Sequence, residues 1–261
     1  MKATLITGAS SGIGEAFARR LADEKHNLVL VARSEEKLRA LRDDLMAEHQ
    51  ITAHYVAIDL IGFEADKQLF EETESHGIEV DWLINNAGFG SMGDFANLDL
   101  ERELQMIDLN VSCLVSLTHR YLQKMRERRS GTIINVSSAA GFQPIPFFAT
   151  YAATKAFVTS FSEAIAEENR PFGIQVMALC PGSTKTNFFE ASNIDRALKV
   201  KGQQTAEEVV ETALKGVAGG RSKIVSGWTN YIGAVMGSLA PNALTTRLIA
   251  KATRSKYQGN E

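Results

Sequence analysis

Near the start of the chain stands the sequence TGASSGIG, residues 7–14, and this stretch decides the fold. It follows the apolar run Ala3–Thr7 and leads into a helical pattern over Gly14–Lys25. Glycines at positions 8, 12 and 14 leave no Cβ where the backbone must turn tightly and approach a pyrophosphate closely. The following helix directs unpaired N–H groups and its positive dipole end at such an anion. A glycine-rich turn can also serve only to pack a helix close to a strand, so the turn alone leaves both interpretations open.

From this turn onward, short apolar runs alternate with segments of helical periodicity. The runs are rich in Ile, Val and Leu without polar alternation, which is typical of strands buried on both faces of a parallel sheet; they are Ala3–Thr7, Leu28–Ala32, Ala53–Ile58, Trp82–Ile84, Thr132–Val136, Ile174–Leu179 and a weaker Lys223–Val225. The helical segments between them are Gly14–Lys25, Glu35–Glu48, Glu64–Ser75, Asp99–Arg128, Tyr151–Asn169 and Ala206–Val217. We therefore predict an α/β fold: one doubly wound, Rossmann-like parallel sheet with helices on both faces.

A single domain over residues 1–261 is expected, since no linker, low-complexity stretch or repeat divides the chain. Two regions depart from the regular alternation. Residues 183–204 are too long for a routine connection and are interpreted as a substrate loop. Residues 228–261 form a C-terminal extension whose basic amphipathic pattern either touches a membrane surface or a partner, or packs on the domain with a solvated basic face.

Composition excludes several classes of protein. The chain has 28 basic and 31 acidic residues, a formal net charge of −3, which argues against a nucleic-acid-binding protein. Its two cysteines, Cys113 and Cys180, and its five histidines show no metal-ligand spacing, so we expect no metal and a reducing compartment. With no secretion signal and no apolar run long enough to cross a bilayer, the sequence predicts a cytoplasmic protein.

The end of the second predicted strand indicates which dinucleotide is bound. An acidic residue there binds both ribose hydroxyls of NAD, but this chain has Ala32-Arg33-Ser34. A guanidinium pairs with a 2′-phosphate that a carboxylate would repel, so Arg33 favours NADP. Arg33 capping the strand in solvent is the alternative. Asp59, after the third strand, is a candidate acceptor for the adenine amino group or a turn-forming residue.

Three residues carry the candidate chemistry. Tyr151 and Lys155 lie four positions apart on one predicted helix, so their side chains share a face. A neighbouring ammonium stabilises phenolate and is expected to lower the pKa of Tyr151 toward a range useful for acid–base catalysis. Ser138, thirteen residues before Tyr151, ends a predicted strand at the sheet edge where ligands bind. Its hydroxyl could hold a substrate carbonyl oxygen.

These residues resemble the short-chain dehydrogenase/reductase family, over nearly the whole chain to about Gly227. The motifs that carry the resemblance are TGASSGIG at 7–14, Asn85-Asn86-Ala87-Gly88, Asn110, Ser138, Tyr151-Ala152-Ala153-Thr154-Lys155 and Pro181-Gly182. The resemblance implies that Tyr151 is the acid/base, that Lys155 lowers its pKa and binds the nicotinamide ribose, and that Ser138 orients the substrate oxygen. It also implies that Asn110 bends its helix and holds a water in a proton relay with Lys155. Ser137 is the rival serine, but the family's spacing selects Ser138.

The implied cofactor site is extensive. Its residues are Gly8, Ser10, Ser11, Gly12, Ile13, Gly14, Arg33, Asp59, Asn86, Ala87, Gly88, Tyr151, Lys155, Pro181, Gly182, Thr184 and Thr186. Among these, Thr186 would hold the nicotinamide carboxamide.

We therefore expect an NADP(H)-dependent oxidoreductase that interconverts a carbonyl and an alcohol. The apolar residues expected around the nicotinamide end favour a hydrophobic ketone or aldehyde, although any of them could instead belong to the core or a subunit interface; they are Phe89, Met92, Phe142, Ile145, Phe147, Phe148, Phe188 and Phe189. An NADPH-binding sensor or scaffold without turnover is the alternative. The apolar stripe of Asp99–Arg128, with the family's habit of pairing this helix, favours a homodimer or homotetramer.

Overall fold

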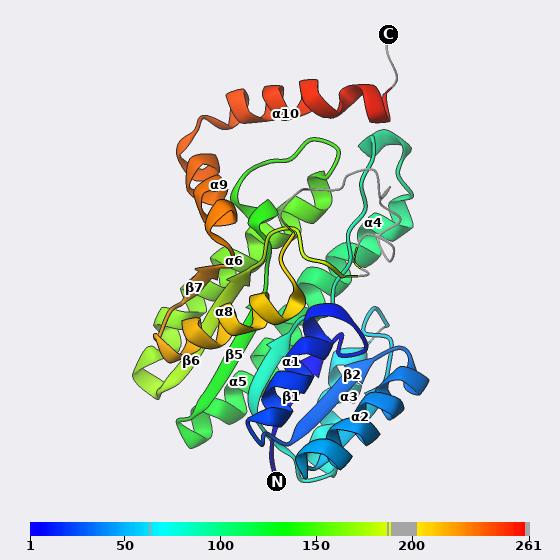
Figure 1. Cartoon of the computed structure of the whole chain (residues 1–261), viewed down its shortest axis with the longest axis vertical. Helices are drawn as coiled ribbons and strands as arrows, with labels where there is room; N and C mark the ends of the chain where they lie inside the picture. The colour runs from blue at the N-terminus through cyan, green and yellow to red at the C-terminus, as the bar shows by residue number, and fades with distance from the viewer. Residues whose placement is uncertain (63, 187, 189–202, 259–261) are drawn as a thin grey trace.

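The computed structural model describes residues 1–62, 64–186, 188 and 203–258. Its centre is a seven-stranded, fully parallel sheet in the order β3-β2-β1-β4-β5-β6-β7 (Figure 1). The strands are β1 Lys2–Thr7, β2 Leu28–Ala32, β3 Ala53–Ala57, β4 Glu79–Asn85, β5 Gly131–Val136, β6 Ile174–Cys180 and β7 Lys223–Val225. The chain reverses direction across the sheet between β1 and β4, so the predicted doubly wound topology is confirmed.

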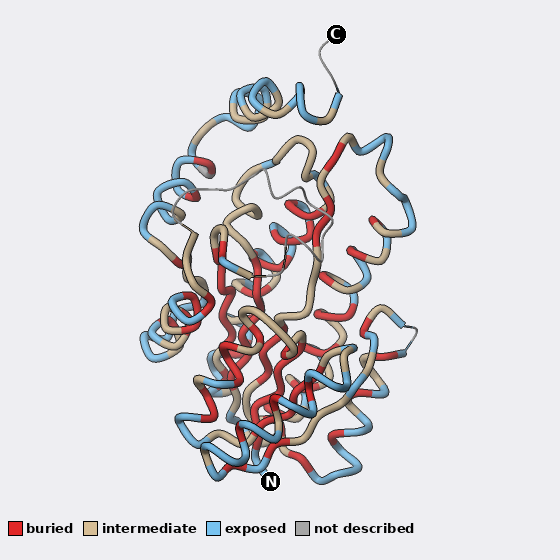
Figure 2. Tube along the Cα trace, turned by 45° about the vertical axis from the view of Figure 1, so that its right-hand side comes forward, coloured by how far each residue is buried: buried red, intermediate tan, exposed pale blue. Residues whose placement is uncertain are grey.

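Helices cover both faces of the sheet and bury two separate apolar layers. One layer packs α1 (Gly12–Asp23), α2 (Glu35–His49) and α8 (Ala206–Ala218) against the sheet. The other packs α3 (Ala65–Ser75), α5 (Leu114–Arg128) and α6 (Ala149–Asn169). Figure 2 shows the resulting pattern, with buried backbone concentrated in the strands and exposed backbone on the outer helices.

The seven apolar runs are strands, as predicted, with ends that differ by a few residues. The predicted helix over Asp99–Arg128 is wrong as a single regular helix. It consists of α4 (Leu100–Ile107), a π-helical segment over Asp108–Cys113, and α5. The amphipathic repeat does not reveal this segment, because its buried positions, Met106, Asn110, Cys113 and Leu117, keep a spacing of three or four residues.

The C-terminal extension is helical in its described part. It contains α9 (Trp228–Leu239) and α10 (Asn242–Tyr257). The predicted substrate loop at 183–204 lies mostly outside the described residues; where described, Thr184 bridges to Gln204.

Buried polar side chains tie the central strands to the two helices behind them. Asn85 on β4 donates through Nδ2 to Asn135 Oδ1 on β5 at 2.9 Å and to Thr118 Oγ1 on α5 at 3.0 Å. Asn135 in turn donates to Ser162 Oγ on α6 at 2.9 Å. All four residues are buried. Because buried polar groups lose water on folding, this chain of hydrogen bonds fixes α5 and α6 against the strands that carry the site.

We expect Asn135→Ala to lower the free energy of unfolding by about 2–4 kcal/mol, because it removes the buried hydrogen bonds that Asn135 makes with the Asn85 amide and the Ser162 hydroxyl. Urea denaturation followed by circular dichroism measures the change. The matched control is Asn97→Ala, an exposed asparagine, for which we expect less than about 0.5 kcal/mol. Equal stability of the two variants would contradict a structural role for the buried network.

Candidate active site

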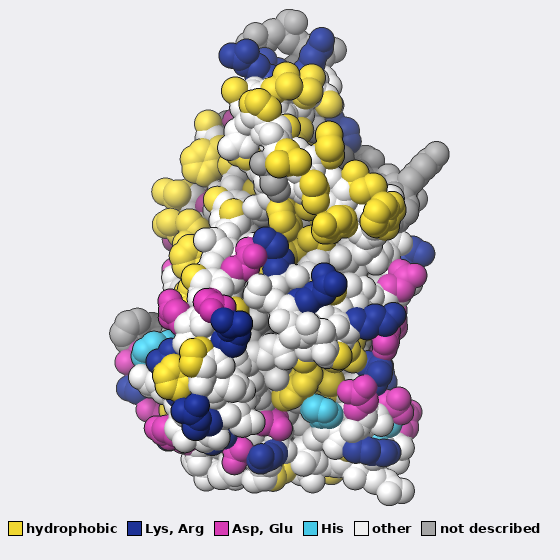
Figure 3. Space-filling model, turned by 90° about the vertical axis from the view of Figure 1, so that its left-hand side faces the viewer, with side chains coloured by type: hydrophobic (Ala, Val, Ile, Leu, Met, Phe, Trp, Pro, Cys, Tyr) yellow, Lys and Arg dark blue, Asp and Glu magenta, His cyan; other side chains and the backbone are white. Residues whose placement is uncertain are grey.

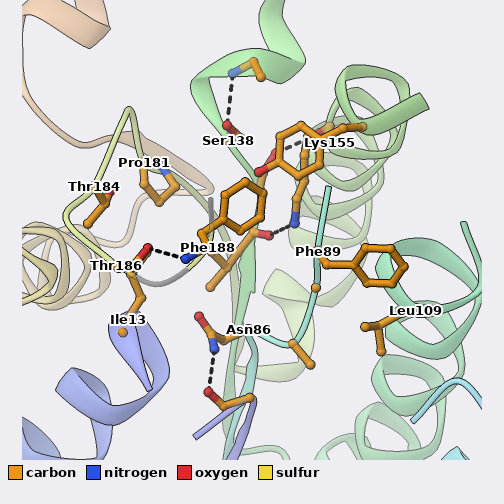
Figure 4. Close-up of a pocket in the computed structure, with 18 of the residues that line it drawn as sticks. Ile13, Asn86, Phe89, Leu109, Ser138, Lys155, Pro181, Thr184, Thr186 and Phe188 are labelled. Atoms are coloured by element: carbon orange, nitrogen blue, oxygen red, sulfur yellow. Dashed lines mark hydrogen bonds between the residues drawn. The ribbon is translucent and has the colours of Figure 1, made fainter. Parts of the chain in front are cut away.

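A large cavity runs along the carboxyl ends of the central strands. Its volume is about 1230 Å³, above the roughly 300–1,000 Å³ of ordinary small-molecule pockets. Ile13 and Asn86 lie at one side of it, and Ser138 and Lys155 at another (Figure 4). The strand edge and the switch point of a doubly wound sheet are where such folds bind ligands.

The glycine turn forms one wall of the cavity. Gly8 and Gly12 have φ angles of +67° and +60°, a backbone conformation that residues with a Cβ rarely adopt. A Cβ at Gly14 would collide with the carbonyl oxygen of Gly8. The three glycines are therefore required by the turn itself, and the turn leaves the amino end of α1 facing the cavity.

Thr7 and Asn86 hold the glycine turn against β4. The Thr7 hydroxyl accepts the backbone N–H groups of Asn86 and Ala87, both at 2.9 Å. The Asn86 amide donates to the carbonyls of Thr7 at 2.9 Å and Gly8 at 3.3 Å. Asn86, Ala87 and Gly88 line the cavity, as predicted, but the Asn86 side chain is used to fix the turn. Thr7 was missed among the candidate residues, although it opens the quoted motif.

Cationic side chains occupy the far end of the cavity, beyond β2. Arg33, the predicted partner of a 2′-phosphate, lies there, with Ser34 and Lys37 beside it. Arg33 and Lys37 are both exposed. The sequence analysis did not single out Lys37, which stands in the first turn of α2. Asp59 also lines the cavity, and its carboxylate accepts the N–H of Ile61 at 3.1 Å, so its turn-forming role is present.

The two candidate serines differ in how they are bonded. Ser137 is buried, and its hydroxyl donates to the Lys155 carbonyl at 2.7 Å and lies 2.7 Å from Thr159 Oγ1. Ser138 is half-buried and begins the 3₁₀ turn Ala139–Phe142 by accepting the N–H of Ala140 at 3.1 Å. Its hydroxyl also lies close enough to the Tyr151 phenol to favour the phenolate and oppose the rise of the Tyr151 pKa. The geometry therefore brings Ser138, and not Ser137, to the phenol.

Tyr151 and Lys155 share the first turns of α6 and are buried together, 8% and 5% exposed. The Lys155 ammonium lies 5.7 Å from the centre of the Tyr151 ring. It donates to the Val136 carbonyl, the last residue of β5, at 2.8 Å. This hydrogen bond fixes the amine at the strand edge.

The expected lowering of the Tyr151 pKa is wrong for this state of the protein. Burial raises the pKa of Tyr151 to about 12, against the smaller opposing effect of the Ser138 hydrogen bond. Burial also lowers the pKa of Lys155 to about 8. Removing water destabilises both charged forms, phenolate and ammonium, and this outweighs their mutual attraction. Tyr151 is consequently a protonated donor at neutral pH.

Asn110 lies in the π-helical segment and is 1% exposed. Its amide donates to the Phe89 carbonyl at 3.0 Å and to Thr154 Oγ1 at 3.2 Å, while its oxygen accepts the Phe89 N–H at 3.2 Å. A Cβ at Gly88 would lie 2.7 Å from the Asn110 oxygen and 3.6 Å from the Lys155 ammonium nitrogen. The side chain thus holds the segment after β4 beside Lys155, and the water relay that the family resemblance implies stays a prediction.

The segment after β6 closes the cavity. Pro181, Gly182, Thr184 and Thr186, which are predicted to bind the cofactor, all line it. A Cβ at Gly182 would collide with the side chain of Asn230 on α9, and one at Gly12 would lie 3.0 Å from Thr186. Asn230 was not predicted, because no family motif reaches the C-terminal extension.

Aromatic and apolar side chains surround the catalytic phenol. Phe148 stacks on the Tyr151 ring with centres 4.4 Å apart, and Phe188 lies against it at 5.4 Å. Of the predicted wall, Phe89, Phe142, Ile145, Phe148 and Phe188 line the cavity. Phe147 stacks instead on Tyr257 of α10 at 5.1 Å. Met92 is not among the lining residues, and Phe189 lies outside the described residues.

Comparison with known proteins places the chain in a class. A family model for short chain dehydrogenases matches residues 2–197. The chain belongs to the short-chain dehydrogenase family. The residues of the site from Gly8 to Thr186 lie within the matched range.

The relatives agree with this membership. The very-long-chain 3-oxoacyl-CoA reductase of Rattus norvegicus is 31% identical over 252 residues, which are 94% of this chain and 76% of the relative. The 17-beta-hydroxysteroid dehydrogenase type 3 of Mus musculus is 34% identical over 215 residues, 81% of this chain and 67% of the relative. A solved short-chain dehydrogenase from Sphingobium yanoikuyae in complex with NADPH superposes with a TM-score of 0.81 at 29% identity, covering 100% of this chain and 98% of that one.

The buried amine gives a stability prediction. Because burial lowers the pKa of Lys155 from 10.5 to about 8, the unfolded chain binds more protons than the folded chain between these pH values. Stability attributable to Lys155 therefore rises with pH across that window. We expect Lys155→Met to gain about 3 kcal/mol relative to wild type at pH 7, a relative gain that disappears by about pH 10.5.

Urea unfolding of wild type and variant at a series of pH values measures this difference. Lys215→Met, which removes an exposed lysine of α8, is the control and should track the wild type at every pH. Parallel pH profiles for wild type and Lys155→Met would contradict the assigned burial of the ammonium.

Proposed function

We propose that this protein is an NADP(H)-dependent oxidoreductase that interconverts a carbonyl and an alcohol on a bulky apolar ketone or aldehyde. One observation supports this most directly: a single cavity joins a glycine-lined anion cradle to a buried Ser138–Tyr151–Lys155 cluster. The anion cradle alone would bind a nucleotide, and the buried cluster alone would polarise a carbonyl. Reduction of a carbonyl by a dinucleotide needs both parts in one cavity.

The cavity fits a phosphorylated dinucleotide along its length. Gly8, Gly12 and Gly14 leave space where a pyrophosphate approaches the backbone, and the amino end of α1 faces that space. At the far end, Arg33 and Lys37 supply two positive charges and Ser34 a hydroxyl, a donor set suited to a 2′-phosphate. The NADPH complex of the relative from Sphingobium yanoikuyae supports the same choice. Bound NADPH would supply a hydride to the substrate carbon.

The chain itself supplies proton transfer and orientation. Ser138 donates to the substrate oxygen and holds it beside the Tyr151 hydroxyl. Tyr151, whose pKa is raised to about 12 by burial, donates its proton to the oxygen as negative charge develops there. Lys155 lies close enough to the ring to stabilise the phenolate that remains, and the Asn110 segment positions it. In the oxidative direction the same groups act in reverse.

An apolar substrate is supported by the wall of the cavity. Phe148 and Phe188 flank the Tyr151 ring, and Phe142 and Ile145 continue the wall. A carbonyl with large hydrophobic substituents would bury its surface against these side chains, whereas a charged sugar would lose hydration there without replacement. The two curated relatives described above, named for a very-long-chain oxoacyl and a steroid reaction, support the same class.

A homo-oligomer, dimer or tetramer, forms part of the proposal. Leu100, Leu104 and Ile107 make an exposed apolar stripe on α4, 66%, 48% and 38% exposed. Phe157 on α6, the helix that contacts α4, is 43% exposed. An exposed stripe of this size on two adjacent helices is typical of a subunit interface.

The location of the protein in the cytoplasm stays a prediction.

We expect Tyr151→Phe to reduce turnover of a hydrophobic ketone about a hundredfold or more, because the proton donor is lost while the ring remains. NADPH affinity, measured by fluorescence titration, should change less than about twofold, since the substitution removes no phosphate contact. The matched control is Tyr121→Phe, a buried tyrosine of α5 bonded to Thr73, which should keep its turnover. Wild-type turnover in Tyr151→Phe would refute the proposed chemistry, and a wild type that binds NADPH but reduces no member of a ketone and aldehyde panel would favour a sensor.

The charged end of the cavity gives a separate prediction. Replacing Arg33 and Lys37 by Ala should raise the KM for NADPH about tenfold or more and leave the KM for NADH nearly unchanged, because only NADPH carries the 2′-phosphate. Steady-state kinetics with both cofactors measure the ratio. Arg39→Ala, an exposed arginine on the same helix and outside the cavity, is the control. Equal losses with both cofactors would show that the two cations do not select the phosphate.

A further inference from the structure

We propose that the outer face of α9 and α10 docks on the surface of an anionic lipid bilayer, next to the entrance of the cavity. Hereafter this outer face is called the C-terminal face. It consists of the outward side chains of residues 228–258 and stands apart from the residues assigned to the reaction. Figure 3 shows hydrophobic side chains gathered over the upper part of this side of the molecule, with basic side chains at its top.

Helix α9 presents its apolar stripe to solvent. The side chains that point outward recur at helical spacing, and they are Trp228 (74% exposed), Tyr231 (50%), Ile232 (45%), Val235 (38%), Met236 (62%) and Leu239 (78%). The inward positions are small or polar: Asn230, Gly233 and Ala234 line the cavity. This is the reverse of a helix that packs on a core, whose apolar stripe faces inward. The α9 segment carries no charged residue.

Helix α10 continues this surface and adds positive charge. It has no buried residue. Leu244 and Leu248, 54% and 59% exposed, lie on one side with Arg247 and Lys251 next to them in the helix. Arg254 and Lys256 follow in the last turn. The described helices of this region include none long and apolar enough to cross a membrane, so the geometry suits a helix pair lying in the interface.

The charge distribution identifies the surface that fits. Residues 228–258 contain four Lys and Arg and no Asp or Glu, in a chain whose net charge is −3. Next to the end of α10, Asp94 accepts a hydrogen bond from Gln258 at 3.0 Å. Exposed aromatic and aliphatic side chains beside basic ones match an anionic headgroup layer with acyl chains beneath it.

A second copy of the chain fits less well. In a two-fold interface the same patch meets itself, so two basic faces would be brought together. The stripe on α4 supplies an apolar face for self-association without that cost. An anionic bilayer neutralises the basic charge of the C-terminal face and buries the apolar stripe of α9 at the same time.

The C-terminal face adjoins the cavity entrance. Asn230 of α9 lines the cavity and hydrogen-bonds Gln204 and the Ser226 carbonyl, and Gln143, another lining residue, contacts the helix near Gly237. At the far end, Tyr257 stacks on Phe147, the neighbour of the cavity-lining Phe148. Docking would therefore place the entrance at the lipid surface, where apolar carbonyl compounds accumulate.

Flotation of the full chain with vesicles tests the proposal. The vesicles contain phosphatidylcholine alone or with 30 mol% phosphatidylserine. We expect binding at least tenfold stronger to the anionic vesicles, weakened by 0.5 M NaCl. The triple variant W228S/M236S/L239S should lose binding at least tenfold. The charge variant K251Q/R254Q should lose about fivefold per residue on anionic vesicles only.

Matched controls separate docking from unfolding and from general stickiness. Met46→Ser removes an exposed apolar side chain of α2, and Arg170→Gln an exposed cation before β6; both should bind like wild type. Thermal unfolding should show that every variant retains its fold. The proposal is overturned if the wild type fails to float with anionic vesicles, if W228S/M236S/L239S floats as well as wild type, or if light scattering shows that the triple variant converts a wild-type oligomer to monomers without a change in lipid binding. None of these readouts depends on turnover, so the proposed reaction can fail or succeed separately.

Discussion

The active site depends on one buried hydrogen bond, from the Lys155 ammonium to the Val136 carbonyl at 2.8 Å. Keeping an amine charged costs free energy when its residue is only 5% exposed. Two rigid elements hold this amine in place. The carbonyl belongs to the end of a central strand, and the amine rises from the first turns of α6. Because that strand end also precedes Ser137 and Ser138, the same interaction sets the serine hydroxyl, the phenol and the amine in register with one another.

The rest of the fold keeps this arrangement in place. Parallel pairing aligns the ends of β1, β4, β5 and β6 at a single edge, and the buried chain from Thr118 through Asn85 and Asn135 to Ser162 prevents α5 and α6 from sliding along it. On the cofactor side, the Thr7 hydroxyl and the Asn86 amide perform the matching task for the glycine turn. Many residues of the family motifs thus hold the backbone around the cavity in place, and fewer of them offer a chemical group to a bound molecule.

The sequence predicted the sheet and the catalytic cluster well, because both follow local rules. Buried parallel strands have an unbroken apolar pattern, and spacing separates Ser138 from Ser137. Other features depend on contacts between distant segments. The buried positions in and around the π-helical segment, Met106, Asn110 and Cys113, have the same three-to-four spacing as in a regular helix. Lys37 lines the cavity because of where α2 packs in the folded chain, and the sequence pattern does not state that position. The raised pKa of Tyr151 reflects desolvation by Phe148 and Phe188, which no four-residue spacing reveals. The outward direction of the α9 stripe was equally hidden, since an apolar period does not state which side faces the core.

Phe147 has a consequence of its own. Its φ angle is +65°, a left-handed backbone conformation that is unfavourable for a bulky residue. The ring is held by stacking on Tyr257, and its carbonyl accepts the Gly93 N–H at 2.9 Å. The residue next to Phe148, which stacks on the catalytic phenol, is therefore anchored to the last described helix. A substitution in α10, remote from every motif of the family, would consequently disturb the packing beside the reaction centre.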